Sequence, residues 1–402
     1  MDHNAWQRSV EEHRQAVLEL VRRPATTEVP LDDALGLVLA HDATSPAHLP
    51  GAAVSAMDGF AVRHADLSPG AVLPVLGDLP AGAPADRPLA PGGAVRIMTG
   101  AVVPPGADTV VAVERTDIPR GPVPLPRHVT IHRPPQPGDA IRAAGSDVAA
   151  GSVVVAAGTR LGAAALAALA ATGHAAASVH PAPRVRVVST GAELRSPGEP
   201  LAPGQLHDSN SFLMASLARA LGHPTERRSV HHDDPAELAA ALPGLLAGTD
   251  ALVLSGGASA GAYEVVRQVL GPRGIDFGQV AMQPGKPQGL GVLDGVPVFC
   301  LPGNPVACAV GFLAFVRPWL DASSARPAGA GTSRVVLASP AAGTPGRTRF
   351  LAARLVGGRA QVCTAQQSHQ VARMVGVDGF VVLGPDQGTV QGGAAVEWLA
   401  LP

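Results

Sequence analysis

The segment ALVLSGGASAG, residues 251–261, couples a continuous apolar run to a glycine-rich loop. Similar apolar runs occur at RVRVVST (184–190), FGQVAMQ (277–283) and VPVFCL (296–301), with amphipathic segments between them. Strands that alternate with helices and are apolar throughout are typical of a mostly parallel sheet covered by helices on both faces. The sequence therefore predicts a three-layer α/β domain, to which we assign residues 182–325.

The rest of the chain is expected to form three further parts. Short apolar runs broken by Pro and Gly predict a β-rich domain at residues 48–140, and a second set of short strands predicts a small C-terminal β domain at 326–402. Helical periodicity returns on both sides of the β-rich part, so residues 1–47 and 141–181 are predicted to form one split helical domain around an insertion. The fold class is thus α/β and multidomain.

Three helices are predicted in the split domain. They cover residues 5–22, residues 31–42 (LDDALGLVLAHD) and the alanine-rich residues 161–172. In the α/β domain, Asp234 followed by Pro235 predicts a helix start, because the carboxylate can cap the helix and the ring fixes φ at its first turn.

The composition excludes several classes of function. With a net charge of -2 and 3% aromatic residues, the chain has neither the basic field nor the stacking side chains of a nucleic-acid groove. Its 3 cysteines form no CxxC pair, which favours a reducing compartment and argues against a thiolate metal site. A polar N-terminus and the lack of a long uninterrupted apolar segment predict a cytoplasmic protein without a membrane anchor.

The loops that follow the predicted strands are the expected binding site, because ligands of open α/β sheets bind beyond the carboxyl ends of the strands. These loops are rich in glycine, which lets backbone N–H groups approach a phosphate or another oxyanion. The chain has neither the GxGxxG of dinucleotide sites nor a P-loop motif. The predicted ligand-binding residues of these loops are Ser255, Gly256, Gly257, Ser259, Gly261, Pro284, Gly285, Pro302, Gly303, Asn304 and Pro305.

Lys286 is the only lysine among 30 basic residues, all the others being arginine. Lysine presents a compact ammonium on a thin stem, whereas arginine presents a planar fork. Because Lys286 lies in the turn PGKP (284–287), we predict that it contacts an oxyanion as a point charge. An ordinary surface turn is the alternative interpretation.

Six carboxylates are candidates for chemistry: Asp58, Asp147, Glu193, Asp233, Asp234 and Glu264. Each taken singly resembles an ordinary helix cap or solvated charge. Asp58 is the exception, because apolar and small residues flank it in SAMDG and an unpartnered charge there would be costly. Carboxylates beside phosphate-binding loops most simply hold Mg²⁺ through oxygen ligands. The predicted metal ligands are Glu193, Asp234 and Glu264.

Taken together, the motifs resemble those of the molybdopterin molybdenumtransferases, the bacterial molybdenum-insertion enzymes, and are similar also to the E domain of gephyrin. The motifs are SAMDGFAVR (55–63), VRIMTGAVVPPGADTVV (95–111), IRAAGSDV (141–148), STGAEL (189–194), DSNSFLM (208–214), SGGASAG (255–261), PGKP (284–287) and LPGNPVA (301–307). The resemblance implies an elongated homodimer and a Mg²⁺-dependent transferase. Its expected substrates are adenylylated molybdopterin and molybdate, and its reaction would release AMP as molybdenum is inserted at the dithiolene.

The resemblance also implies roles for individual residues. Asp58, Asp147, Glu193 and Lys286 would be catalytic, while Thr99 and Ser368 would join the ligand-binding set. The first two carboxylates and Thr99 would reach the cleft from the β-rich domain of the partner subunit. Molybdopterin adenylyltransferase and the molybdoenzymes would be protein partners.

Four positions depart from the family's usual pattern. Ser146 replaces Glu, Ala192 replaces Asp, Glu264 replaces Asp and Gln283 replaces a frequent Lys. Three of these changes remove a charge, so the site is less charged than is typical. A diverged paralogue that binds or carries molybdopterin or the finished cofactor is therefore the second functional hypothesis, and an adenylyltransferase is the third.

Overall fold

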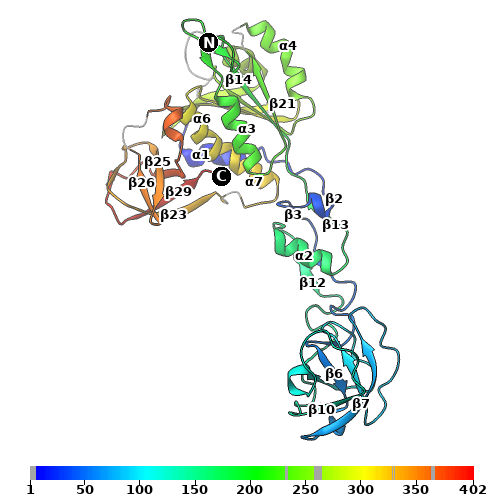
Figure 1. Ribbon diagram of the computed structural model, residues 1–402. Coiled ribbons are helices and arrows are strands. Elements are labelled where there is room, and N and C mark those ends of the chain that lie inside the picture. Colours follow the sequence, from blue (N-terminus) through cyan, green and yellow to red (C-terminus); the bar gives the residue numbers. More distant parts are fainter. Residues whose placement is uncertain (1–5, 231–233, 258–264, 328, 330, 364–366) are drawn as a thin grey trace. The chain divides into compact units, whose positions relative to one another are not determined.

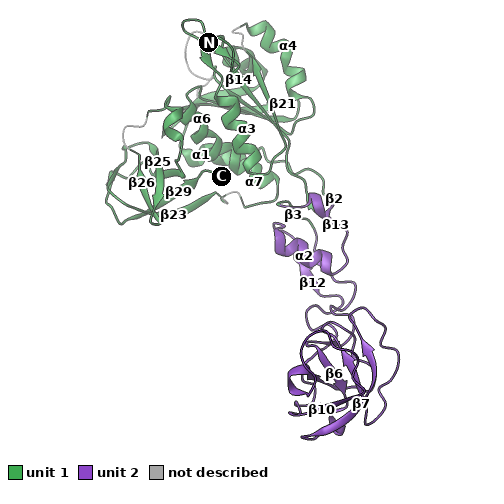
Figure 2. Cartoon of the chain, in the orientation of Figure 1, with its two compact units in different colours: residues 1–27, 36–40, 178–402 green, residues 28–35, 41–177 purple. Residues whose placement is uncertain are grey.

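The computed structural model describes residues 6–230, 234–257, 265–327, 329, 331–363 and 367–402. The chain forms two compact units (Figures 1 and 2). Unit 1 comprises residues 1–27, 36–40 and 178–402, and unit 2 comprises residues 28–35 and 41–177. This division is coarser than the four domains expected from the sequence, whose boundaries stay a prediction.

A seven-stranded sheet lies at the centre of unit 1. In order across the sheet, its strands are β1 (Gln7–Arg8), β19 (Ile275–Val280), β21 (Pro287–Leu293), β22 (Val296–Leu301), β18 (Ala251–Ser255), β14 (Val185–Thr190) and β17 (Thr225–Val230). Strands β22, β18, β14 and β17 are mutually parallel, whereas β21 is antiparallel to both of its neighbours. The sheet is therefore mixed, and the sequence analysis did not foresee β21.

Helices pack against both faces of this sheet, which explains why its strands are apolar throughout. Val187 and Val253 point to a core cluster shared with α3 (Asn210–Ala220) and α6 (Pro305–Gly311). Leu252 and Leu254 point to a second cluster, shared with α4 (Pro235–Leu246) and α5 (Val265–Leu270). The predicted start of α4 is confirmed, since Asp234 accepts the Ala236 N–H at 2.8 Å and Pro235 occupies the first turn.

One long helical stretch of unit 1 is part of its core. Helix α6 continues through a π-helical turn (Phe312–Val316) into α7 (Arg317–Ser323). Among the described residues, Pro305–Ser323 is long and apolar enough to cross a membrane, but 89% of it is buried inside the protein. Burial of that extent is the usual property of a core helix.

The C-terminal part of unit 1 is a six-stranded sheet. Its strands are β20 (Met282–Gln283), β25 (Thr348–Val356), β26 (Arg359–Val362), β23 (Thr332–Leu337), β29 (Ala395–Ala400) and β27 (Gly379–Leu383). An additional pairing of β25 with β27 closes five of them into a barrel. Strand β20 immediately precedes the PGKP turn, and β21 of the seven-stranded sheet begins at its last residue, Pro287. The turn therefore connects the two sheets.

Unit 2 is rich in β-structure, as the sequence indicated. Its main sheet has five strands, in the order β10 (His128–Ile131), β7 (Ala71–Leu79), β8 (Ala94–Ile97), β6 (Gly59–Val62) and β9 (Thr109–Ala112). The alanine-rich segment forms the predicted helix, α2 (Ala163–Ala171).

Two helix predictions near the N-terminus need correction. The helix predicted at residues 31–42 is wrong: Leu31–Asp33 forms a single 3-10 turn and Val38–Leu39 forms strand β3. Gly36 has φ 80, a left-handed conformation that no α-helix contains. The helix predicted at residues 5–22 is shorter, because α1 (Val10–Leu18) begins at a capping box between Ser9 and Glu12.

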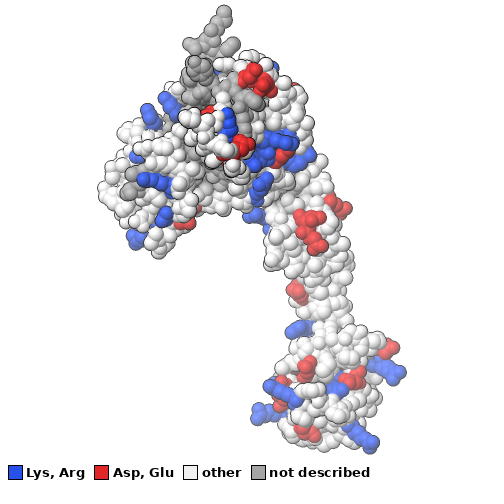
Figure 3. Space-filling model, turned by 45° about the horizontal axis from the view of Figure 1, so that its top comes forward, with Lys and Arg blue, Asp and Glu red and all other residues white. Residues whose placement is uncertain are grey.

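Charged side chains make up 15% of the chain. On the face drawn in Figure 3, uncharged residues cover most of both units, and basic and acidic residues are interspersed.

Candidate functional site

A cleft of about 1670 Å³ opens in unit 1 at the carboxyl ends of three parallel strands. Ser189 and Thr190 end β14, Ser255 ends β18, and Pro302 follows β22. Residues of β25 and the segment 367–369 line the side formed by the C-terminal sheet. The cleft thus lies between the α/β part and the C-terminal part of one compact unit, where the strand rule places ligands.

Most of the residues predicted from the α/β loops line this cleft. They are Glu193, Ser255, Gly256, Gly257, Pro284, Gly285, Lys286, Pro302, Gly303, Asn304 and Pro305, joined by Ser368 from the C-terminal part. Predicted residues Ser259, Gly261 and Glu264 lie outside the described residues.

The loop after β18 requires glycine at two positions. Gly256 has φ 98 and Gly257 has φ 62, both in the left-handed region. A Cβ atom at Gly256 would lie 2.4 Å from the carbonyl oxygen of Thr190. The backbone at Gly256 therefore approaches the end of β14 so closely that a residue with a side chain would not fit there.

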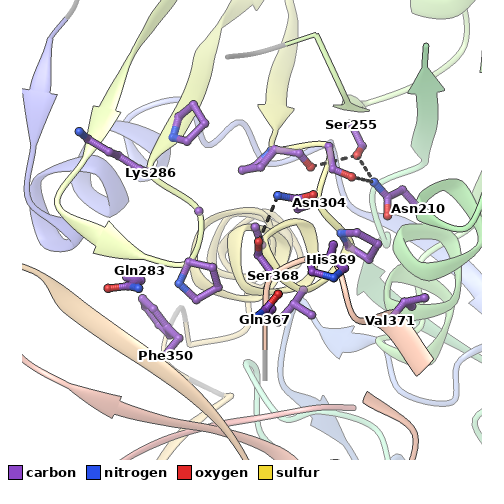
Figure 4. A pocket seen from close by; sticks show the side chains of 18 of the residues that line it. Asn210, Ser255, Gln283, Lys286, Asn304, Phe350, Gln367, Ser368, His369 and Val371 are labelled. Atoms are coloured by element: carbon purple, nitrogen blue, oxygen red, sulfur yellow. Dashed lines mark hydrogen bonds between the residues drawn. The ribbon is translucent and has the colours of Figure 1, made fainter. Parts of the chain in front are cut away.

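Hydrogen bonds to its backbone carbonyl groups fix the turn that carries Lys286. The Val280 N–H donates to the Lys286 carbonyl oxygen at 2.8 Å, and the buried Gln288 amide donates to the Gly285 carbonyl oxygen at 2.7 Å. The Lys286 side chain is exposed and, among the described residues, has no acidic partner within ion-pair distance. Figure 4 shows its ammonium apart from Asn304 and Ser368.

Two cations that the sequence analysis missed line the cleft from the C-terminal sheet. Arg347 is exposed, and the half-buried Arg349 donates to the Ala342 carbonyl oxygen at 2.8 Å. Arg349 lies opposite Gln283 in the parallel pairing of β20 with β25. Their contribution depends on the pairing of strands far apart in sequence, so no local pattern could reveal it.

The two sides of the cleft are joined near its centre. The Asn304 side-chain amide donates to Ser368 Oγ at 3.1 Å, and the Val306 N–H donates to the Ser368 carbonyl oxygen at 2.9 Å (Figure 4). Ser368 therefore connects the C-terminal part to the loop after β22.

The motif DSNSFLM (208–214) supplies three buried polar residues that the sequence analysis quoted without assigning, Asp208, Asn210 and Ser211. Asp208 accepts the N–H and the hydroxyl of Ser211, and the hydroxyl of Ser229 at 2.8 Å. Burial raises the pKa of Asp208, but these hydrogen bonds outweigh burial and hold the pKa below its ordinary value. Asn210 donates to Ser255 and to the Gly303 carbonyl oxygen.

The remaining predicted residues belong to unit 2. Asp58 Oδ1 accepts the N–H and the hydroxyl of Thr99, each at 2.7 Å. These two hydrogen bonds, led by that from the backbone, hold the pKa of Asp58 below its usual value. Although apolar and small residues flank Asp58 in the sequence, its side chain is exposed, and Thr99 is its hydrogen-bond partner; Asp147 is exposed as well.

The three predicted metal ligands do not come together in the described residues. Glu193 lines the cleft, Asp234 caps α4 and is absent from the lining, and Glu264 is not described. No cluster of three His, Cys, Asp or Glu side chains suited to a metal ion occurs within the described ranges.

Comparison with known proteins settles the family. Residues 8–173 match the model of the MoeA N-terminal region (domain I and II), residues 186–322 match a probable molybdopterin binding domain, and residues 334–401 match the MoeA C-terminal region (domain IV). Over 382 residues the chain is 41% identical to molybdopterin molybdenumtransferase 2 of Mycobacterium tuberculosis, covering 92% of this chain and 90% of the relative. The chain belongs to the molybdopterin molybdenumtransferase family.

Other relatives agree. The molybdopterin molybdenumtransferase of Bacillus subtilis is 34% identical over 318 residues, which are 77% of this chain and 73% of that protein. The crystal structure of a molybdopterin biosynthesis protein from Pyrococcus horikoshii aligns with a TM-score of 0.83 and 30% identity, over 98% of this chain and 99% of the other. Family membership makes the chain a transferase of molybdenum cofactor biosynthesis.

Proposed function

We propose that this transferase inserts molybdenum from molybdate into adenylylated molybdopterin and releases AMP. One observation carries the proposal: glycine loops and three cations, Lys286, Arg347 and Arg349, line the same cleft. Both substrates are oxyanions, one as molybdate and the other through its phosphoanhydride. Backbone N–H groups and cations together are the groups that bind such anions.

In the proposed reaction, water attacks the anhydride between the molybdopterin phosphate and AMP. The P–O bond to the leaving phosphate breaks and AMP departs. Lys286 would act as a point charge on the oxygens that gain negative charge, and the two arginines would hold the anion by their planar forks. Molybdate would then form two Mo–S bonds to the dithiolene sulfurs of the bound molybdopterin, while one of its Mo–O bonds breaks and that oxygen leaves as water with the two thiol protons.

The requirement for Mg²⁺ belongs to the proposal and rests on the resemblance. Mg²⁺ commonly binds through one or two carboxylates together with substrate phosphates. Of the predicted ligands, Glu193 alone is a described residue of the cleft lining, so Glu193 is the carboxylate that we propose would contribute. Bound there, the ion would neutralise charge on the anhydride.

We also propose that the chain acts as a homodimer in the cytoplasm, with Asp58, Thr99 and Asp147 of one subunit completing the cleft of the other. Molybdopterin adenylyltransferase and the molybdoenzymes are the proposed protein partners, as supplier of the substrate and recipients of the product.

A carrier of molybdopterin is the second candidate, favoured by the uncharged residues Ser146, Ala192 and Gln283. Binding and turnover separate the two candidates. Wild-type protein is mixed with adenylylated molybdopterin, molybdate and Mg²⁺, and both bound ligand and free AMP are measured over time. Catalytic release of AMP supports the transferase reaction, whereas stoichiometric binding with no AMP identifies a carrier.

A further inference from the structure

Asn210 occupies the first turn of α3, and its side-chain amide lies against two loops of the cleft. The residue is buried, with 9% of its surface exposed. Its Nδ2 donates to Ser255 Oγ at 2.7 Å and to the Gly303 carbonyl oxygen at 2.6 Å (Figure 4). Ser255 Oγ in turn donates to the Pro302 carbonyl oxygen at 3.2 Å. One amide group therefore connects the end of β18 to the loop that follows β22.

The sheet itself does not hold these loops together. The pairing of β18 with β22 ends at Ser255 and Leu301, where the Gly256 N–H adds one bond of 3.3 Å to the Leu301 carbonyl oxygen. Among the described residues, Pro302 and Gly303 are tied to the β18 loop only by the hydrogen bonds of Ser255 and Asn210. The spacing of the two loops beyond the sheet is consequently set by the direct bond from Ser255 to Pro302 and by Asn210 of a third element, α3.

The chemistry of this junction requires an amide. The Gly303 carbonyl oxygen can only accept, and the hydroxyl proton of Ser255 is engaged by Pro302, so both partners need a donor. The two hydrogens of an Asn Nδ2 satisfy both. A carboxylate of the same shape would place an oxygen against the Gly303 carbonyl oxygen and lose that bond. It could keep a bond to Ser255 only if the hydroxyl proton of Ser255 left the Pro302 carbonyl oxygen, which makes Asn210→Asp a sharp probe.

We infer that Asn210 is a positioning residue, which fixes the distance between the loops Ser255–Gly257 and Pro302–Asn304 and so shapes the oxyanion cradle. The nature of the anion rests on the proposed function. The loop spacing is a property of the unliganded chain and can be tested separately.

The first test compares Asn210→Asp with a matched control, Thr249→Val. Thr249 is also buried, and its hydroxyl contacts the carbonyl oxygens of Arg184 and Ala251 at 2.9 Å, at the opposite end of β18. Calorimetric titration with molybdate gives the Kd of each variant, and thermal unfolding gives its Tm. We expect Asn210→Asp to raise the Kd at least about tenfold, because misplaced donors lose charge-assisted bonds, while Thr249→Val changes it less than about twofold.

Two results of this titration would overturn the inference. One is wild-type affinity in Asn210→Asp. The other is a loss of affinity in both variants that follows their loss of Tm, which would reduce Asn210 to a general stabiliser. Should Asn210→Asp fail to fold, Asn210→Ala removes both donors without adding a charge and leaves Ser255 in place, and a rise in Kd is again expected; an unchanged Kd would count against the inference.

The second test is independent of any ligand. A crystal structure of unliganded Asn210→Asp should show Gly303 displaced from Ser255 relative to the wild-type protein, and loops in the wild-type position would overturn the inference. If the wild-type protein fails to bind molybdate, the proposed function fails, and the loop positions still decide the role of Asn210. In the AMP-release assay, the variant should raise KM for molybdate by a larger factor than it lowers kcat.

Discussion

Asp58 and Thr99 are joined by two hydrogen bonds in unit 2, because Asp58 Oδ1 accepts both the backbone N–H and the hydroxyl of Thr99 at 2.7 Å. The proposed function places both residues in one site, and 41 positions separate them along the chain. Together they present an ionised carboxylate on an exposed surface, with its orientation fixed by Thr99. An exposed and oriented carboxylate is suited to a ligand or to a second subunit.

A subunit-mixing experiment tests whether that carboxylate completes a neighbour's cleft. Asp58→Ala and Lys286→Ala should each abolish activity as homodimers. Mixed by co-expression, they should recover about a quarter of the wild-type activity, because half of randomly formed dimers are mixed and each of those holds one intact site. Activity no higher than that of the separate variants would contradict a shared site.

Substitution by alanine should cost more stability at Gly256 than at Gly303, although both glycines line the cleft. At Gly256 a Cβ would lie 2.4 Å from the Thr190 carbonyl oxygen in a left-handed backbone, whereas at Gly303 the nearest heavy atom would be 3.6 Å away. Gly256→Ala should lower the free energy of unfolding by more than about 1 kcal/mol, and Gly303→Ala by less than about 0.5 kcal/mol. Urea denaturation measures both, and equal losses would contradict the close backbone approach.

Gln283 offers a way to raise the charge of the cleft. It is exposed and lies opposite Arg349, beside the PGKP turn. Gln283→Lys should lower the Kd for molybdate by about two- to fivefold, a gain that added salt should reduce, because an exposed charge contributes about 0.5–1 kcal/mol. Gln283→Met is the uncharged control of similar length. Identical affinities for the two variants would place position 283 outside the anion site.

His13 should make unfolding depend on pH. Burial lowers its pKa to about 3, and the ring packs between Trp6 and Phe315, with centroid distances of 4.9 and 4.5 Å. In the unfolded chain His13 takes up a proton below about pH 6.5, whereas in the folded chain it stays neutral down to about pH 3. The free energy of unfolding therefore falls as the pH drops from 6.5 toward 3, by up to about 1.4 kcal/mol per pH unit. His13→Phe keeps an aromatic ring and removes the titration.

The measurement is Tm as a function of pH, with His128→Gln as an exposed control. His13→Phe should lose less Tm between pH 7 and pH 4 than the wild type, and the control should match the wild type. Burial lowers the pKa of His223 to about 4. This residue is present in both the wild type and His13→Phe, so part of the dependence of Tm on pH should remain in the variant. Parallel curves for His13→Phe and the wild type would show that His13 is not the group responsible.

The sequence revealed those parts of the site that follow from local chemistry. An apolar run that ends in glycines predicts a strand followed by a loop that can bind an anion, and such loops line the cleft. Asp234 before Pro235 predicts a helix start, and helix α4 begins there. The solitary lysine was visible by counting alone.

What the sequence did not reveal depends on contacts between distant segments. Arg349 enters the cleft because β25 pairs with β20, and Asn210 reaches Gly303 across 93 positions. Strand β21 escaped prediction because its glycines, Gly289 and Gly291, weaken the apolar pattern; they are required where Cβ atoms would meet Phe277 and Ile275 of the neighbouring strand. The helix predicted at residues 31–42 failed because a single glycine, Gly36, adopts a left-handed conformation.

In the proposed function, Lys286 and its cleft catalyse a molybdate-dependent release of AMP. The most direct measurement is AMP release from adenylylated molybdopterin by the purified protein, with and without molybdate and Mg²⁺, beside Lys286→Ala and Lys286→Arg. We expect molybdate to stimulate release by the wild type, and both variants to lose most of the activity with unchanged Tm, because neither provides a compact ammonium. Release that ignores molybdate, or that Lys286→Arg sustains at the wild-type rate, would contradict the account.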